Sequence, residues 1–351
     1  MFSGCRTSLV LKLLFTIVVT LFCALVAVAQ NCGNCLGSAV GVFNDLSVTS
    51  SNPFNESHSV FAGAADTSDS WTIRKRVDEV MLFFTVTKGH KFVDDLTQQD
   101  VSVKDDNKPP AKVSAFGHQS DLPLRLGLLV DTSSSVQYRF SFEQEAASRF
   151  LRKIVRSQTD RAFVMGFTDS ANLTQDYTGN PDELGRGISS LSSEGATALF
   201  DAVRASCSKL SGTTDQTPTA RILVLLSDGD DNASKSTLKQ AIETAQRAEV
   251  TIYTISTNNS SYSQPGDRIL KDLAAQTGGQ MFSRNNAKEM VKAFSAIEQE
   301  MRSRYALAYQ PAELQEDGRF HRIEVKAHRL NEKFRVHARK GYYARLALSG
   351  N

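Results

Sequence analysis

Residues 124–135, which read LRLGLLVDTSSS, constrain the fold more than any other stretch of the chain. The apolar run from Leu126 to Val130 has the length and composition of a strand buried on both faces of a parallel sheet. Asp131, Ser133 and Ser135 follow at once, so a carboxylate and two hydroxyls share one tight loop. In open α/β sheets this edge is where ligands bind. The sequence therefore predicts a ligand site, and a hard divalent cation accounts most simply for the oxygen donors.

Strands and helices alternate through the middle of the chain. Apolar runs predict five strands, at 124–131, 161–168, 220–227, 250–257 and 280–283. Between them, apolar residues recur at helical spacing over 142–155, 238–245 and 290–301. This alternation predicts an α/β fold in which a doubly wound, mostly parallel, Rossmann-like sheet has helices on both faces.

The segments on either side carry short strand patterns instead. Those before the central region lie at 80–86, 101–103 and 112–116, and those after it at 305–309, 320–327 and 334–338. Because neither flank is large enough to fold alone, we expect the two to form one small β-rich unit. The expected boundaries are 1–29 for a signal peptide, 30–73 for a flexible linker, 74–120 and 304–345 for the two parts of the β unit, and 121–303 for the central domain.

The first 29 residues have the pattern of a secretory leader. Arg6 and Lys12 precede an apolar run over 13–28, and Ala27-Val28-Ala29 is a small-x-small cleavage pattern. An uncleaved membrane anchor is the alternative, because the run approaches the length that spans a bilayer. Without this segment the chain is formally neutral, which gives no general affinity for nucleic acid or anionic lipid. We expect an exported protein in the periplasm, at the cell surface or secreted, with membrane contact only if the leader stays uncleaved.

Cysteine usage is sparse beyond the leader. Cys32 and Cys35 could close a small disulfide in an oxidising compartment. Cys207 shares a helical face with apolar residues and is expected to be a buried, inert thiol.

Two further segments place oxygen donors near the edge that carries Asp131. Thr197 follows a loop of small residues at the start of a predicted helix. The apolar strand over 222–226 ends in Ser227-Asp228-Gly229, so its carboxylate would emerge at the same edge if both strands are central. The set contains hydroxyl and carboxylate oxygens and no nitrogen or sulfur. Such a set favours Mg²⁺, with Ca²⁺ or Mn²⁺ as alternatives.

Asp131-x-Ser133-x-Ser135, a later Thr197 and a later Ser227-Asp228-Gly229 resemble, in this order, the metal-ion-dependent adhesion site of von Willebrand factor A (VWA) domains. The resemblance covers residues 124–303 and is complete at all five metal-site positions. The ends of the chain add a narrower likeness to an exported bacterial VWA-related family described from Acidobacteria. The segments that carry this likeness are 124–136, 305–309, 318–325 and 338–343.

The resemblance implies a role for each site residue. Ser133 and Ser135 would bind the cation directly, and Thr197 would bind it directly or through water. Asp131 and Asp228 would act through water or through hydrogen bonds to the hydroxyls. A cation held mainly by neutral hydroxyls keeps its charge and an open position, which can accept an Asp or Glu carboxylate from a protein partner. The implied function is a binding or adhesion module, with no catalytic residue and no organic cofactor.

Two other functions stay open: a metal-dependent hydrolase with Asp131 as nucleophile or ligand, and a structural envelope protein whose metal is incidental. An aspartyl phosphatase would carry a second aspartate where Ser133 stands. An imidazole base is also missing from 124–303, because all six histidines lie outside it. They are His58, His90, His118, His321, His328 and His337.

Some oxygen donors have a plainer explanation. Serine and aspartate after a strand also cap helices, and Ser141 could cap the helix that follows. The segment 228–232 resembles the opening of a calcium-binding loop, but Ala233 and Lys239 occupy the positions that need Gly and Glu. We therefore expect a solvated acidic loop there, which could tune partner selectivity.

Overall fold

The computed structural model describes residues 79–346, apart from 90, 134–139, 193–194, 214, 216, 259–261, 284–286, 314–315 and 331. All described residues belong to the second of the two units into which the chain divides, Ser68–Asn351. The expected leader (1–29), linker (30–73) and Cys32–Cys35 disulfide therefore lie outside the described residues, and so does Ser135.

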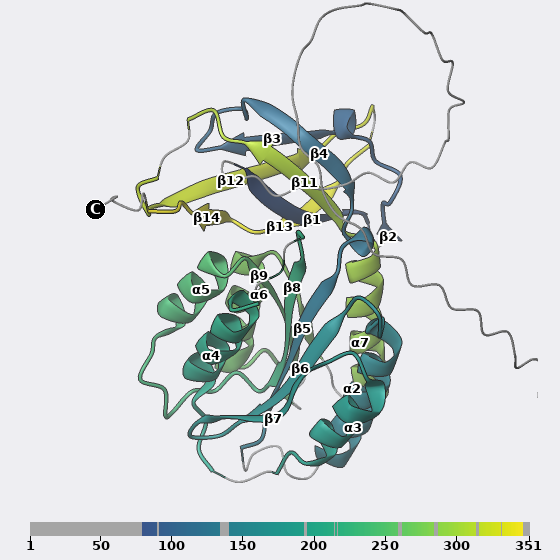
Figure 1. Ribbon diagram of the computed structural model, residues 1–351, viewed down its shortest axis with the longest axis vertical. Helices are drawn as coiled ribbons and strands as arrows, with labels where there is room; N and C mark the ends of the chain where they lie inside the picture. The colour runs from purple at the N-terminus through teal and green to yellow at the C-terminus, as the bar shows by residue number, and fades with distance from the viewer. Residues whose placement is uncertain are drawn as a thin grey trace, which may run out of the picture. The chain divides into compact units, whose positions relative to one another are not determined.

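A six-stranded sheet with the order β10-β9-β8-β5-β6-β7 forms the centre of the α/β part of the molecule (Figure 1). Neighbouring strands run parallel from β10 to β6, and β7 pairs antiparallel with β6 at one edge. The predicted α/β class with a mostly parallel sheet is thus confirmed. The strands are β5 (Leu124–Asp131), β6 (Arg161–Phe167), β7 (Ala171–Thr178), β8 (Ala220–Ser227), β9 (Val250–Ser256) and β10 (Met281–Ser283).

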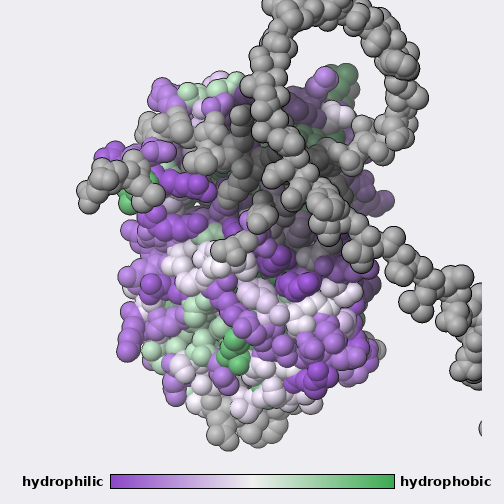
Figure 2. Space-filling view, viewed as in Figure 1, coloured by the Kyte–Doolittle hydropathy of each residue, from purple (hydrophilic) through white to green (hydrophobic). Residues whose placement is uncertain are grey.

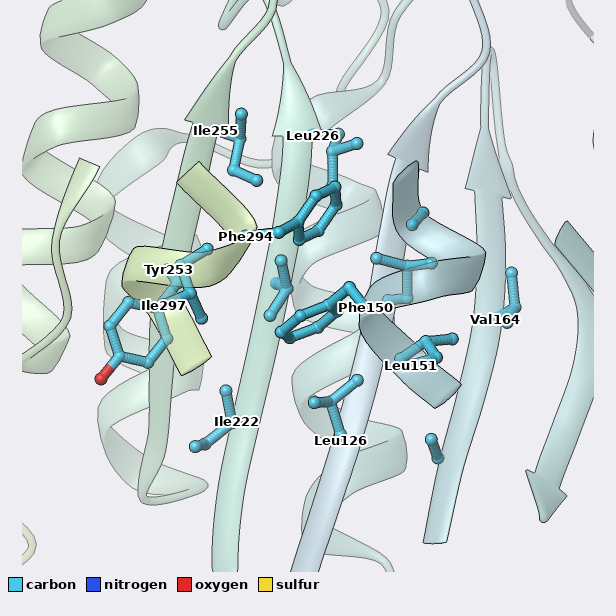
Figure 3. Packing of buried hydrophobic residues seen from close by; sticks show 14 of the residues in the cluster. Leu126, Phe150, Leu151, Val164, Ile222, Leu226, Tyr253, Ile255, Phe294 and Ile297 are labelled. Atoms are coloured by element: carbon cyan, nitrogen blue, oxygen red, sulfur yellow. The ribbon is translucent and has the colours of Figure 1, made fainter. Parts of the chain in front are cut away.

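Helices cover both faces of this sheet, because its central strands are apolar on both sides. Leu126 and Leu128 pack toward one layer of helices, and Leu129 packs toward the other. Within the first layer, the rings of Phe150 and Phe294 stack with centroids 4.8 Å apart (Figure 3). The first layer contains α2 (Phe140–Ile154), α3 (Pro181–Ser189) and α7 (Ala287–Arg302), and the second contains α4 (Leu199–Ser211), α5 (Leu238–Arg247) and α6 (Pro265–Thr277).

Several details differ from the expectations. Strand β7 and helices α3 and α6 were not predicted from the sequence. Strand β7 is a partly exposed edge strand with a mostly polar sequence, which shows no strand period. Ser141 lies inside the first turn of α2, which begins at Phe140, so it is not the cap of that helix. Cys207 is fully buried and burial raises the pKa of its thiol, as expected of an inert cysteine.

The flanking segments pair with each other in two further sheets. One has the order β13-β1-β11-β4, with β2 paired to β1, and the other has the order β14-β12-β3. The pair β1–β11 joins the two flanking segments, with Leu82 opposite Leu307. The strands are β1 (Val80–Lys88), β2 (Lys91–Phe92), β3 (Val101–Asp105), β4 (Lys112–His118), β11 (Tyr305–Gln310), β12 (Phe320–Ala327), β13 (Arg335–Ala338) and β14 (Gly341–Tyr343), with short 3₁₀ helices η1 (Gln98–Asp100) and η2 (Gln119–Asp121).

No helix among the described residues is both long and apolar enough to span a bilayer. On the face seen in Figure 2, hydrophilic and neutral side chains predominate, with a smaller hydrophobic area over the α/β part.

Two buried charges lie where α7 leads into β11. Glu300 accepts hydrogen bonds from the Thr85 hydroxyl (3.3 Å) and from the Gln280 side-chain amide (2.7 Å). Arg304 donates through Nη2 to the hydroxyl of Thr251, 3.0 Å away. Because Thr85 is on β1 and Thr251 is on β9, this pair of charges links the central sheet to the flanking strands.

The buried Glu300 predicts that the unfolding free energy of the protein falls as the pH rises. Burial raises the pKa of Glu300 to about 7 from its ordinary 4.5, and the charge of Arg304 offsets this only in part. An acid with a raised pKa in the folded state contributes its full stability below pH 4.5 and loses it as the pH rises through 7. Glu300→Gln removes the ionisable group. Between pH 5 and pH 8, wild type should therefore lose on the order of 2–3 kcal/mol of unfolding free energy relative to the variant. Urea denaturation at both pH values measures this difference, and parallel pH profiles would contradict it.

Candidate metal centre

The predicted site lies at the carboxyl edge of the central sheet. Asp131 is the last residue of β5, which lies between β8 and β6. In the register of these strands, Val130 faces Leu226, so Asp131 and Ser227 reach the edge together. The chain leaves β5 toward β6 on one side, whereas β8 lies on the other. Edges of this kind, where the strand order reverses, form the ligand crevice of open α/β sheets.

The Asp131 carboxylate is buried and held by both of its oxygens. Its Oδ1 accepts a hydrogen bond from the Ser133 backbone N–H (3.0 Å), and its Oδ2 accepts one from the Ser227 hydroxyl (2.7 Å). The Ser227 hydroxyl in turn accepts from the Gly229 N–H at 3.0 Å. The bond to Ser133 closes a tight turn that brings this serine, also buried, back to the edge.

Burial controls the electrostatics of this carboxylate. Asp131 is 1% exposed, and the loss of hydration raises its pKa above the ordinary value. Hydrogen bonds from Ser133 and Ser227 lower the pKa, and the negative charge of Asp228 raises it. A cation next to Asp131 and Asp228 would offset both the burial and the repulsion.

Asp228 is half-buried, and its backbone is fixed by close packing. Its carbonyl accepts a hydrogen bond from the Asn258 side-chain amide (2.8 Å), and its Oδ1 accepts one from the Asp230 N–H (3.1 Å). Gly229 has a φ of +84°, and a Cβ there would lie 2.2 Å from the carbonyl oxygen of Gly266 in α6. The loop after β8 therefore requires glycine at this point, and it can hold Asp228 at the edge.

Thr197 lies two residues before α4 and is joined to the loop after β8 by three hydrogen bonds. Its N–H donates to Asn232 Oδ1 (2.9 Å), and its carbonyl accepts from the N–H groups of Asn232 (3.0 Å) and Ala233 (3.1 Å). Thr197 itself is buried. These bonds connect the predicted threonine ligand with the segment that carries Asp228.

The same loop binds the first turn of α4 in both directions. Asp231 Oδ1 accepts from the Phe200 N–H (3.3 Å), and the carboxylate of Asp201 accepts from the N–H groups of Lys235 (2.9 Å) and Ser236 (3.0 Å). In the acidic loop expected over 228–232, Asp230 and Asn232 are exposed, as predicted. Asp231 and Asn232 also accept hydrogen bonds from the backbone of Phe200 and Thr197, a role that the sequence analysis did not include. The N-cap of α4 is Ala198, whose side chain cannot cap the helix. An alanine at this position is the sequence feature that could have indicated that residues outside the helix bind its first turn.

The described donors fit a hard divalent cation. Asp131, Ser133 and Asp228 offer carboxylate and hydroxyl oxygens at one sheet edge, and Thr197 adds a hydroxyl from the adjoining loop. Sets made only of oxygens suit Mg²⁺ or Ca²⁺ rather than softer metals. A position for Ser135 is not described.

The hydrogen bonds between Asn232 and Thr197 predict that substitution of Asn232 lowers the stability of the protein even without metal. Asn232→Ala removes the acceptor for the buried Thr197 N–H and should lower the unfolding free energy by about 1–2 kcal/mol in chelator. Asn232→Asp keeps an acceptor oxygen and should retain most of the stability. Urea denaturation of the three proteins in chelator tests this prediction. An alanine variant as stable as wild type would show that the Asn232–Thr197 hydrogen bond does not stabilise the protein.

Comparison with known proteins gives a domain assignment. A family profile described as the von Willebrand factor type A domain matches residues 126–296. Among curated proteins, none matches the chain in sequence.

Several solved structures are similar in fold. The PilB minor pilin from Streptococcus sanguinis is 14% identical with a TM-score of 0.43, and the match covers 56% of this chain and 63% of the pilin, which is less than two thirds of the pilin's length. The vWF domain of the type V pili tip protein Mfa5 from Porphyromonas gingivalis is 14% identical with a TM-score of 0.40, over 51% of this chain and 94% of that domain. A von Willebrand factor type A protein from Catenulispora acidiphila is 11% identical with a TM-score of 0.45, over 78% of this chain and 75% of that one. The family match and the sheet described above agree: the central α/β part of this chain is a von Willebrand factor type A domain.

Proposed function

We propose that this chain is an exported binding module that captures a protein partner through a divalent cation. The cation, Mg²⁺ by preference, would be held by Asp131, Ser133, Ser135, Thr197 and Asp228. The observation that carries the proposal is the buried Asp131 carboxylate, which Ser133 and Ser227 fix at the ligand-binding edge of the sheet. A buried carboxylate with raised pKa beside a second acidic side chain is a place where a cation is stabilised.

The roles of the residues follow from their chemistry. The hydroxyls of Ser133, Ser135 and Thr197 would hold the ion, while Asp131 and Asp228 orient them and balance the charge. When bound, the ion supplies a Lewis-acid position that can accept a carboxylate. The partner would therefore present an Asp or Glu side chain, and neither nucleic acid nor lipid is needed.

The enzyme alternative has less support. A nucleophilic Asp131 would need an accessible oxygen, whereas both of its oxygens accept hydrogen bonds and the residue is 1% exposed. The sequence also has no histidine between 124 and 303 to act as a base. A structural envelope role with incidental metal is the remaining alternative, and metal-dependent capture of a partner distinguishes it.

We further propose the organisation of the whole protein. A signal peptide over 1–29 would direct the chain to the periplasm, the cell surface or the medium, and a linker over 30–73 would follow. The VWA domain would extend over 121–303, with 74–120 and 304–345 forming one small β-rich unit in the manner of an exported bacterial VWA-related family.

Magnesium should stabilise the protein through this site. Raising Mg²⁺ to about 100 times its dissociation constant should add about 2.7 kcal/mol to the unfolding free energy of wild type. Asp131→Ala should abolish this Mg²⁺-dependent stabilisation. Thr197→Ala should also reduce the stabilisation, and it removes no buried charge. Asp176→Ala, which replaces an exposed aspartate on β7, is the control and should keep the full stabilisation.

Calorimetric titration and thermal unfolding with and without chelator measure the effect. A wild type that neither binds Mg²⁺, Ca²⁺ or Mn²⁺ nor gains stability would overturn the metal site. Partner capture that persists in chelator and in Asp131→Ala would overturn the binding mechanism. Phosphatase or peptidase turnover abolished by Asp131→Ala would support the enzyme instead.

A further inference from the structure

A second group of metal-ligating side chains lies in the sheet β14-β12-β3, away from the edge that carries Asp131. Asp105 ends β3, Asp106 follows with a left-handed backbone (φ 46°), and His321 lies on β12. One ligand atom from each of these side chains lies within 4.8 Å of the other two. Asp105 and His321 are 6% and 7% exposed, whereas Asp106 is exposed, so the group is buried on one side and open to solvent on the other.

The imidazole of His321 lies between two carboxylates. Its Nδ1 is 2.9 Å from Oδ2 of Asp106, and its Nε2 is 3.3 Å from Oδ1 of Asp317. On one side the ring stacks on Tyr342, with centroids 5.3 Å apart. Both nitrogens therefore face groups that, when ionised, can only accept hydrogen bonds.

This arrangement can accommodate a cation. A neutral imidazole carries one N–H, so it can donate to only one of the two carboxylates. With Nε2–H donating to Asp317, the Nδ1 lone pair would point at an oxygen of Asp106. A metal ion coordinated by Nδ1 and by Oδ2 of Asp106 would satisfy both atoms.

The surroundings orient the carboxylates of the site. The hydroxyls of Tyr309 and Tyr342 both donate to Oδ2 of Asp105, each at 2.9 Å, and so orient this carboxylate. The Arg322 N–H donates to Oδ1 of Asp106 (2.8 Å), which turns Oδ2 toward the imidazole. A carboxylate on the far nitrogen of a histidine, here Asp317, is the usual partner of a metal-binding imidazole, because it fixes the tautomer.

We propose that Asp105, Asp106 and His321 form a second cation site, which takes a divalent transition-metal ion of the Zn²⁺ class. One imidazole nitrogen with carboxylate oxygens suits Zn²⁺ and its neighbours, whereas Mg²⁺ prefers oxygen donors alone. Asp106 and His321 are 215 positions apart in the sequence, so the ion ties the turn after β3 to β12. Asp317 acts through His321 as a positioning residue.

The test uses the full chain carrying Asp131→Ala, which removes the contribution of the first site. After chelator treatment, the protein is titrated with Zn²⁺ by calorimetry and with Co²⁺ by visible absorption. We expect one saturable equivalent of either ion and a Co²⁺ spectrum with a nitrogen ligand. His321→Ala should abolish binding, and Asp317→Asn should weaken it about ten- to hundredfold.

Two further variants keep the result interpretable. Asp106→Asn changes an exposed side chain and can still accept the Arg322 N–H, so it tests the site even if His321→Ala fails to fold. His328→Ala removes an exposed histidine just beyond β12 and should leave binding unchanged. Absence of saturable binding, or binding that survives both His321→Ala and Asp106→Asn, would overturn the proposal. Neither result bears on Mg²⁺ binding by the wild-type VWA domain.

Discussion

The burial of one carboxylate at the end of the central strand β5 governs the architecture around it. Strand β5 is covered by helices on both faces, so Asp131 reaches the sheet edge with almost no contact with water. An ionised group in such a place is tolerated only when its oxygens are satisfied. The Ser133 N–H and the Ser227 hydroxyl do this, and Ser227 can do so because β8 runs parallel to β5 in register. The strand order, the turn after β5 and the loop after β8 are thereby linked.

Much of this could be predicted from the sequence because the signals are local. The apolar runs that become β5 and β8 end in aspartates, and parallel pairing alone brings those ends to one edge. Helical periodicity indicated α2, α5 and α7 for the same reason. Thr197 and Asp228 were candidates through their place after a loop and a strand, and the structure links their segments through Asn232.

Other features depend on contacts that no local pattern reveals. Strand β7 is an edge strand whose polar sequence shows no buried face. The hydrogen bonds of Asp231 and Ser236 to the first turn of α4 join residues more than 30 positions apart, so composition alone could not indicate them. His321 was noted only for lying outside the central domain. Its carboxylate partners come from the turn after β3 and from the segment before β12, and only folding brings them together.

The central claim is that the oxygens at the edge of the VWA domain hold a divalent cation. Crystals of the wild-type chain soaked in Mn²⁺ test it directly, because the anomalous signal places the ion independently of any activity. The account predicts a peak within coordination distance of the hydroxyls of Ser133 and Thr197, which disappears in Asp131→Ala crystals. No peak at that edge while the ion is present in excess, whether or not the ion binds elsewhere, would contradict it.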